Sequence, residues 1–105
     1  MKANTFLDKA KAIIADDMSS VNVEYLAKQL KLHPAHVYRK IKLATNCSPS
    51  IFIRDIRLKK GEELLKTTDM MVKDIAYTVG FNTPSYFIEC FRHKHEMTPE
   101  EFRRF

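Results

Sequence analysis

The sequence predicts an all-α fold of seven helices, and three observations lead to this prediction. Only 2 Gly and 4 Pro occur among the 105 residues, which is too few for the tight turns of a small β-sandwich or β-barrel. Apolar residues recur at every third or fourth position along most of the chain, as on the buried face of an amphipathic helix. The second half of the chain also repeats the apolar pattern of the first. We expect one domain, residues 1–105, whose core needs no metal or disulfide.

Three helices are expected in the first part of the chain. The first covers residues 6–16, with an apolar face that consists of Phe6, Leu7, Ala10, Ile13 and Ile14. Asn22 is a favourable N-cap for the second helix. Pro34 suits the first turn of the third, where His33 is a weaker cap. The inward residues are Val23, Leu26, Ala27 and Leu30 in the second helix and Val37, Ile41 and Ala44 in the third.

Four further helices follow. A Ser-Pro pair at 48–49 indicates the start of a long helix. With about twenty residues at 1.5 Å each, it measures on the order of 30 Å. Gly80 is suited to the left-handed end of the fifth helix, and a Thr-Pro pair at 83–84 begins the sixth. A second Thr-Pro pair at 98–99, followed by Glu101, has the form of a capping box for a short seventh helix.

An internal duplication organises these helices. The matched pairs, first 49 and then 50 residues apart, are Val23/Val72, Leu26/Ile75, Ala27/Ala76, Leu30/Val79, Leu32/Phe81, Val37/Phe87, Ile41/Phe91, Lys42/Arg92, Ser48/Thr98, Pro49/Pro99 and Phe52/Phe102. Each copy is a short helix, a tight turn and a second helix, which favours two helix-turn-helix subdomains over a hairpin repeated only for packing. Their expected ranges are about 22–45 and 72–96, with a linker helix over about 48–67 and a C-terminal helix over about 98–104.

The positive charge is concentrated in one part of the chain. The net charge is +5, but residues 28–60 alone hold nine Lys or Arg against one acidic residue, Asp55. A basic region of this kind is typical of proteins that bind a polyanion, although a solvated surface can carry the same charge.

The third helix presents a polar face that is suited to DNA. With Val37 pointing inward and about 100° per residue, Arg39 lies on the opposite side. An Arg at that place can bind guanine through two hydrogen bonds, so Arg39 is the first candidate for reading a base. The other candidates are Ala35 and Tyr38 for bases, and His36, Lys40 and Lys42, with Arg54 of the linker helix, for phosphates.

The sixth helix presents an equivalent face with a different charge. The candidates there are Ser85, Ile88 and Glu89 for bases, and Thr83, Tyr86 and Arg92 for phosphates. Glu89 stands at the place of Arg39, where a carboxylate can accept from cytosine but repels phosphates. We therefore expect this helix to bind more weakly, or to rely on contacts to the DNA backbone from Thr83, Ser85, Tyr86 and Arg92. The alternative is that Glu89 only forms an ion pair within the protein. Because successive major grooves lie about 34 Å apart, one chain could use both helices on one duplex.

Several of these segments resemble the AraC/XylS family of transcription regulators. They are 75–81 (IAYTVGF), 84–87 (PSYF), 91–92 (FR) and 98–103 (TPEEFR) in the second copy, with 37–42 (VYRKIK), 48–49 (SP) and 52–58 in the first copy and linker. The resemblance implies a seven-helix regulator that binds promoter DNA, with RNA polymerase as a further candidate partner. The first half is also similar to the C-terminal output domain of Bacteroides-type hybrid two-component regulators.

The chain departs from the family pattern at four positions. Lys31 and Glu96 stand at usual glycines, Gly61 at a usual alanine of the linker helix, and Glu89 at a commonly basic or polar position. A left-handed backbone at Lys31 would cost about 1 kcal/mol.

Other functional classes receive little support from the sequence. No phosphate-binding loop, nucleophile motif or zinc spacing occurs, so we expect no catalytic residues, no metal and no cofactor. Cys47 and Cys90 are expected to stay unpaired, and no segment is apolar enough to cross a membrane. We expect a cytoplasmic domain that is monomeric in isolation. The alternative is a helical adaptor that binds proteins, which predicts apolar stripes on the outward faces.

Overall fold

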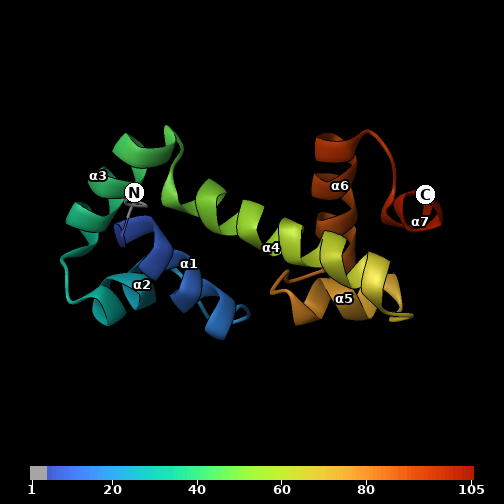
Figure 1. The fold of residues 1–105 in the computed structure, drawn as a ribbon, viewed down its shortest axis with the longest axis horizontal. Coiled ribbons are helices and arrows are strands. Elements are labelled where there is room, and N and C mark those ends of the chain that lie inside the picture. The colour runs from blue at the N-terminus through green and yellow to red at the C-terminus, as the bar shows by residue number, and fades with distance from the viewer. Residues whose placement is uncertain (1–4) are drawn as a thin grey trace. The chain divides into compact units, whose positions relative to one another are not determined.

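The computed structural model describes residues 5–105 and contains seven α-helices (Figure 1). They are α1 (Thr5–Asp16), α2 (Val23–Leu30), α3 (Pro34–Thr45), α4 (Pro49–Thr67), α5 (Val72–Thr78), α6 (Pro84–His95) and α7 (Pro99–Arg104). No β-strand occurs between residues 5 and 105. The all-α prediction with seven helices is therefore confirmed.

The chain forms two compact units that divide within α4. The first unit extends to Ile56 and holds α1, α2, α3 and the beginning of α4. The second begins at Arg57 and holds the rest of α4 with α5, α6 and α7. Each unit has its own apolar core.

The core of the first unit lies among α1, α2, α3 and the start of α4. Its buried side chains are Ala10, Ile14, Val21, Leu26, Ala27, Val37, Ile41, Phe52 and Ile53. The expected caps are confirmed, since Asn22 Oδ1 accepts from the Tyr25 amide at 2.7 Å and His33 Nδ1 accepts from the Ala35 amide at 3.1 Å. One expected core residue was wrong: Ala44 is exposed, because it lies in the last turn of α3, beyond the reach of this core.

Aromatic rings dominate the core of the second unit. The Phe87 and Phe91 rings are fully buried with centroids 5.7 Å apart, and Phe81 and Phe102 meet them at 5.2 Å each. Edge and tilted contacts of this kind add to the burial of apolar area. Large rings let α6 pack tightly against the shorter α5 and against α4.

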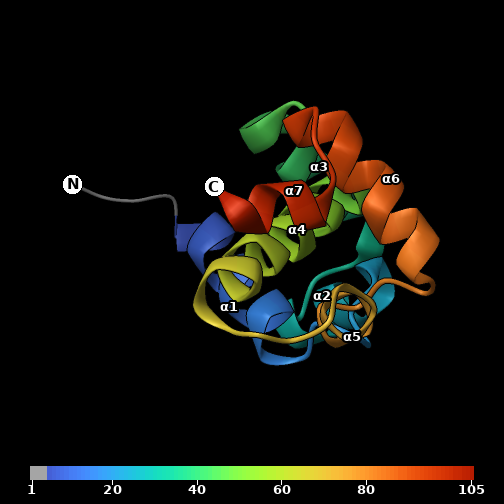
Figure 2. The ribbon, with the colours of Figure 1, turned by 90° about the vertical axis from the view of Figure 1, so that its right-hand side faces the viewer.

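The short helix α7 is held at the C-terminal end of α4 (Figure 2). Lys66 Nζ donates to the Phe102 carbonyl at 2.9 Å. Arg103 donates from Nε to the Leu65 carbonyl at 3.1 Å and from a terminal nitrogen to the Thr68 carbonyl at 3.2 Å. The two Arg103 bonds satisfy carbonyls that the C-terminal end of α4 leaves free.

The predicted capping box begins α7. The Thr98 amide donates to Glu101 Oε1 at 2.8 Å, and the Glu101 amide donates to the Thr98 hydroxyl at 3.1 Å. The backbone hydrogen bond from Thr98 holds the pKa of the Glu101 carboxyl below its ordinary value.

The duplication extends to backbone geometry and burial. Lys31 and Gly80, which are 49 residues apart, both have positive φ, of 60° and 101°. Asn46 and Glu96, 50 residues apart, do so as well, at 62° and 58°. Residue by residue, 41–50 and 91–100 have the same burial class. The left-handed backbone expected at Lys31 is thus present.

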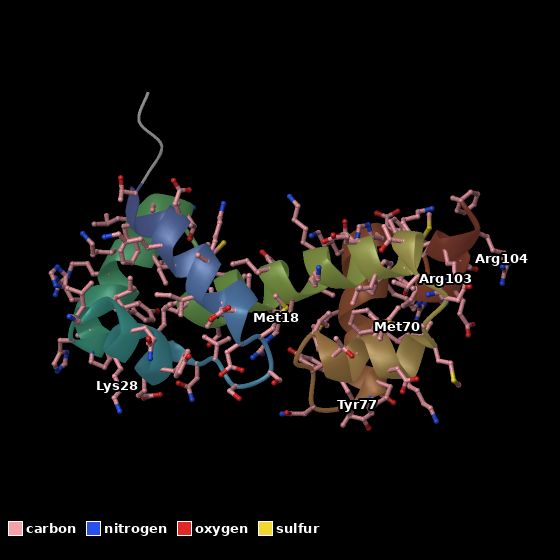
Figure 3. The ribbon with its side chains drawn as sticks, turned by 60° about the horizontal axis from the view of Figure 1, so that its bottom comes forward. Met18, Lys28, Met70, Tyr77, Arg103 and Arg104 are labelled. Carbon is pink, nitrogen blue, oxygen red and sulfur yellow. The ribbon has the colours of Figure 1, made fainter. Side chains whose placement is uncertain are left out.

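The equivalence also holds on the outer surface of the shorter helices. Lys28 on α2 and Tyr77 on α5 are 49 residues apart, and both point away from their cores (Figure 3). Because both positions are exposed, one copy can carry a lysine and the other a tyrosine there without a change in how the helices pack.

Besides the matches at offsets of 49 and 50 residues, the burial pattern shows that α1 matches the second part of α4. At an offset of 51 residues, Leu7, Ala10 and Ile14 of α1 match Leu58, Gly61 and Leu65 of α4. The second part of α4 therefore takes in the second unit the place that α1 has in the first. Each unit is a three-helix core closed by a further Pro-initiated helix, namely the start of α4 or α7.

Gly61 is explained by this packing. A Cβ atom at this position would lie 2.9 Å from the Cε1 and Cζ atoms of the buried Phe87 ring. The glycine, which departs from the alanine usual at this position of the linker helix, is what lets the ring pack directly on the α4 backbone.

Candidate nucleic-acid interface

The outward face of α3 carries the first set of candidate residues. Val37 and Ile41 are fully buried and fix which side of the helix faces the core. On the other side the exposed candidates are Ala35, His36, Tyr38, Arg39 and Lys42. Helix α3 contains no acidic residue, so this face is neutral or cationic along its whole length.

The N-terminus of α3 is rigidly capped. His33 Nδ1 accepts a hydrogen bond from the Ala35 amide at 3.1 Å. Pro34 occupies the first turn without loss of an intrahelical bond. The cap and the proline together define where α3 begins, one residue before Ala35.

Two of the basic candidates in the first unit are less accessible. Lys40 is half-buried, with its Nζ 5.2 Å from the centroid of the Phe6 ring. This cation–π contact draws the ammonium toward α1. Arg54 is half-buried on α4. Next along α4, desolvation by burial lowers the pKa of Arg57 from its ordinary value. The readily accessible positive charges on the α3 face are Arg39 and Lys42.

The outward face of α6 carries the second set. Thr83, Ser85, Tyr86, Glu89 and Arg92 are all exposed. The Thr83 hydroxyl also accepts from the Tyr86 amide at 3.1 Å and so caps the helix.

Ile88 departs from the rest of the α6 set because it is half-buried. It lines a cavity of about 540 Å³ together with Met71, Pro84 and Pro99. Its side chain therefore lies toward α5 and α7, whereas Tyr38, its equivalent on α3, is 49% exposed.

Glu89 is exposed at the place where α3 has Arg39. Among residues 5–105 the ion pairs of the second unit involve Glu62 and Glu63, and none is made by Glu89. The interpretation of Glu89 as half of an internal ion pair therefore gains no support. Its carboxylate is available to an external donor and unfavourable to a phosphate.

The two units differ in net charge as well as in their outward helix. Residues 1–56 contain nine basic and five acidic residues, a net of +4, whereas residues 57–105 contain nine and eight, a net of +1. A polyanion is therefore attracted more strongly by the first unit.

Leu43 was not among the residues expected on the outward face of α3. This side chain is 80% exposed in the last turn of α3. The helical period already held the signal, because Leu43 lies about 240° around the helix from Val37, on the polar side. An apolar residue there is an exception to an otherwise polar or charged face.

Between residues 5 and 105, no three His, Cys, Asp or Glu side chains gather as metal ligands would. Cys47 and Cys90 are both free thiols. None of the helices described combines the length and apolar character that crossing a membrane requires.

The chain is similar to known helix-turn-helix proteins. A family described as a helix-turn-helix domain matches residues 26–104. The chain is 37% identical over 99 residues to histidine kinase P4 of Formosa agariphila, a match that covers 92% of this chain and 7% of that protein. It is 34% identical over 83 residues to the HTH-type transcriptional activator RhaS of Mannheimia succiniciproducens, over 79% of this chain and 31% of the activator.

The fold is also similar to that of a solved structure. The C-terminal domain of AraT, a response regulator from Geobacillus stearothermophilus, superposes with a TM-score of 0.84 and 27% identity, over 99% of this chain and 88% of that one. The chain spans less than a third of the length of either relative named above.

Proposed function

Because the chain belongs to the AraC/XylS family of helix-turn-helix DNA-binding domains of transcription regulators, we propose that it reads double-stranded promoter DNA with α3 and α6 as two recognition helices in successive major grooves. This family is not a class of enzymes. One observation supports the proposal above the others: two duplicated three-helix units each turn a capped, solvent-exposed polar helix face outward.

In the first unit, α3 supplies most of the affinity and specificity. Arg39 binds a guanine edge, while Ala35 and Tyr38 make apolar and polar contacts to neighbouring bases. Lys42 and His36 bind phosphates, and Lys40 and Arg54 do so at the edge of the face. The absence of acidic residues from α3 supports this assignment.

In the second unit, α6 binds more weakly. Glu89 accepts a hydrogen bond from a cytosine amino group, and Ser85 contacts an adjacent base. Thr83, Tyr86 and Arg92 hold the phosphate backbone. Ile88 contributes at the margin, since its half-buried side chain is turned toward the cavity beside α7.

The complete regulator is proposed from its relatives. The similarity to histidine kinase P4 and to the AraT response regulator supports an output domain at the end of a cytoplasmic two-component signalling protein. We expect RNA polymerase to be a partner at the promoter. We expect the isolated domain to bind DNA as a monomer, because one chain already carries two recognition helices.

The adaptor alternative requires apolar stripes on the outward faces of α3 and α6. Those faces are mostly polar or charged, with Ala35, Leu43 and the aromatic rings of Tyr38 and Tyr86 as the exceptions. This composition favours DNA over a protein partner at the two helix faces.

Selection of bound duplexes from a random pool, followed by affinity measurements at several salt concentrations, tests the proposal. We expect a bipartite motif and an affinity that falls steeply as salt rises. Insertion of about 5 bp, half a helical turn, between the two half-sites turns one of them away and should weaken binding to the level of one unit. Affinity that is independent of salt, or of this insertion, would contradict the proposal.

A further inference from the structure

A groove of about 410 Å³ lies between α1 and α2, and no residue of α3 belongs to its lining. Its lining consists of Lys9, Ala12, Ile13, Gln29, Leu30 and Lys31. The lining therefore contains three aliphatic side chains and two lysines, and it contains no carboxylate. Ile13 and Leu30 are only half-buried, so both keep apolar surface exposed beside the groove.

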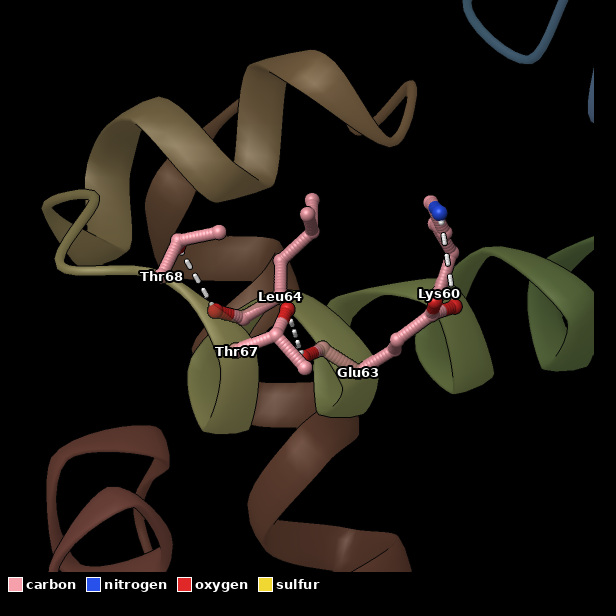
Figure 4. Close-up of polar contacts among 5 residues, drawn as sticks. All are labelled: Lys60, Glu63, Leu64, Thr67 and Thr68. Carbon is pink, nitrogen blue, oxygen red and sulfur yellow. Dashed lines mark hydrogen bonds and ion pairs between the residues drawn. The ribbon is translucent and has the colours of Figure 1, made fainter.

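The second unit has charges of both signs at the equivalent place. At the offset of 51 residues, Lys60 and Glu63 of α4 stand where Lys9 and Ala12 stand on α1. The Lys60 Nζ lies 3.3 Å from Glu63 Oε1, so the lysine has a partner within its own helix (Figure 4). In the first unit an alanine occupies the position of that carboxylate, and Lys9 lacks the equivalent partner.

The other side of the groove, formed by the end of α2, also differs from its equivalent at the end of α5. Val79, the equivalent of Leu30, is fully buried, whereas Leu30 is half-buried. Gly80 takes the place of Lys31 and carries no charge. At this place the first unit therefore has two lysines and no carboxylate beside the exposed part of Leu30, whereas the second unit has a buried Val79 and a paired Lys60.

We propose that this groove binds an acidic segment of a partner protein that carries aliphatic side chains. The partner's aliphatic groups pack on Ala12, Ile13 and Leu30, and its carboxylates bind Lys9 and Lys31. Charge complementarity selects this occupant, because the lining offers no negative charge of its own. A DNA backbone would supply the negative charge but no aliphatic group to cover the apolar floor. The inference does not depend on the roles proposed for α3 and α6.

A fluorescein-labelled peptide in which Glu-Glu and Leu-Leu pairs alternate is a suitable probe. Its binding to the whole chain is followed by fluorescence anisotropy, and the site is located by amide NMR. The decisive variant is Ala12→Glu, which recreates the lysine–glutamate pair of the second unit and fills the groove. Ala15→Glu is the matched control, because Ala15 is an exposed residue of α1 outside the groove lining and its replacement changes the net charge equally. Circular dichroism checks that both variants keep their helices.

We expect the peptide to perturb the amides of Ile13 and Leu30, and Ala12→Glu to weaken its binding at least about tenfold while Ala15→Glu has little effect. Equal losses in the two variants would reduce the effect to general charge and overturn the proposal. A peptide with Ser in place of Leu that binds equally well would overturn it too. So would a DNA duplex that perturbs the same amides and displaces the peptide, or no peptide binding at concentrations up to about 1 mM.

Discussion

Replacement of Gly61 by alanine tests how closely α6 packs on α4. At an exposed position in a helix, Gly→Ala stabilises by about 1 kcal/mol. At Gly61 the new Cβ would lie 2.9 Å from two carbons of the Phe87 ring, where about 3.5 Å or more is comfortable. The ring is fully buried and has little free space in which to move. Overpacking of this kind costs about 1 to 3 kcal/mol.

The two effects leave Gly61→Ala between neutral and about 2 kcal/mol less stable than the natural chain. Urea unfolding followed by circular dichroism measures this difference, with both units observed because they can unfold separately. The control is the same substitution in a Phe87→Leu background, where the ring is gone. There Gly61→Ala should stabilise by about 1 kcal/mol, which gives a coupling of about 1 to 3 kcal/mol between the two positions. Stabilisation by about 1 kcal/mol in both backgrounds would refute the packing argument.

Three further predictions concern the DNA face, the backbone and pH. Arg39→Ala should lose about 1 to 3 kcal/mol of discrimination at one base pair, whereas Lys42→Ala should weaken binding to all duplexes alike. Competition binding on single-base variants of the selected site distinguishes the two effects. An unchanged specificity profile for Arg39→Ala counts against its role as base reader. Lys31→Gly should raise the free energy of unfolding by about 1 kcal/mol, since glycine accepts positive φ without strain; an unchanged urea midpoint would show no strain there. The lowered pKa of Glu101 means that its capping of Thr98 is complete above the ordinary carboxyl pKa and is lost as pH falls through the lowered value. Glu101→Gln should therefore reduce the acid-induced loss of stability, and equal losses in both chains would contradict this origin.

The helices and their caps were predictable because their causes are local. Asn22, His33 and Thr98 cap helices at the positions where the sequence places them, since a cap needs only a side chain and an amide two or three residues away. The duplication was visible for a similar reason, because buried positions repeat with the period of the helix.

The outward faces of α3 and α6 were predictable in part. Helical geometry correctly indicated that Arg39, Lys42 and Glu89 are exposed, because Val37 and Phe87 set the inward direction. It could not show that the Lys40 ammonium lies over the Phe6 ring or that Ile88 is half-buried beside the α5–α7 cavity. Those outcomes depend on neighbours from other helices, which a single helical wheel does not contain.

By itself, the sequence determined the number and type of the helices, the starting residues of five of them, the two copies and the exposure of Arg39 and Glu89 on the outward faces, because each of these follows from patterns along the chain. Only the tertiary structure decided that the second part of α4 takes the place of α1, that Gly61 must be small for Phe87 to pack, and that a cationic groove stays open between α1 and α2. The physical reason is that close packing and grooves arise between segments distant along the chain, and the volumes that must fit there are summed in space rather than along the sequence.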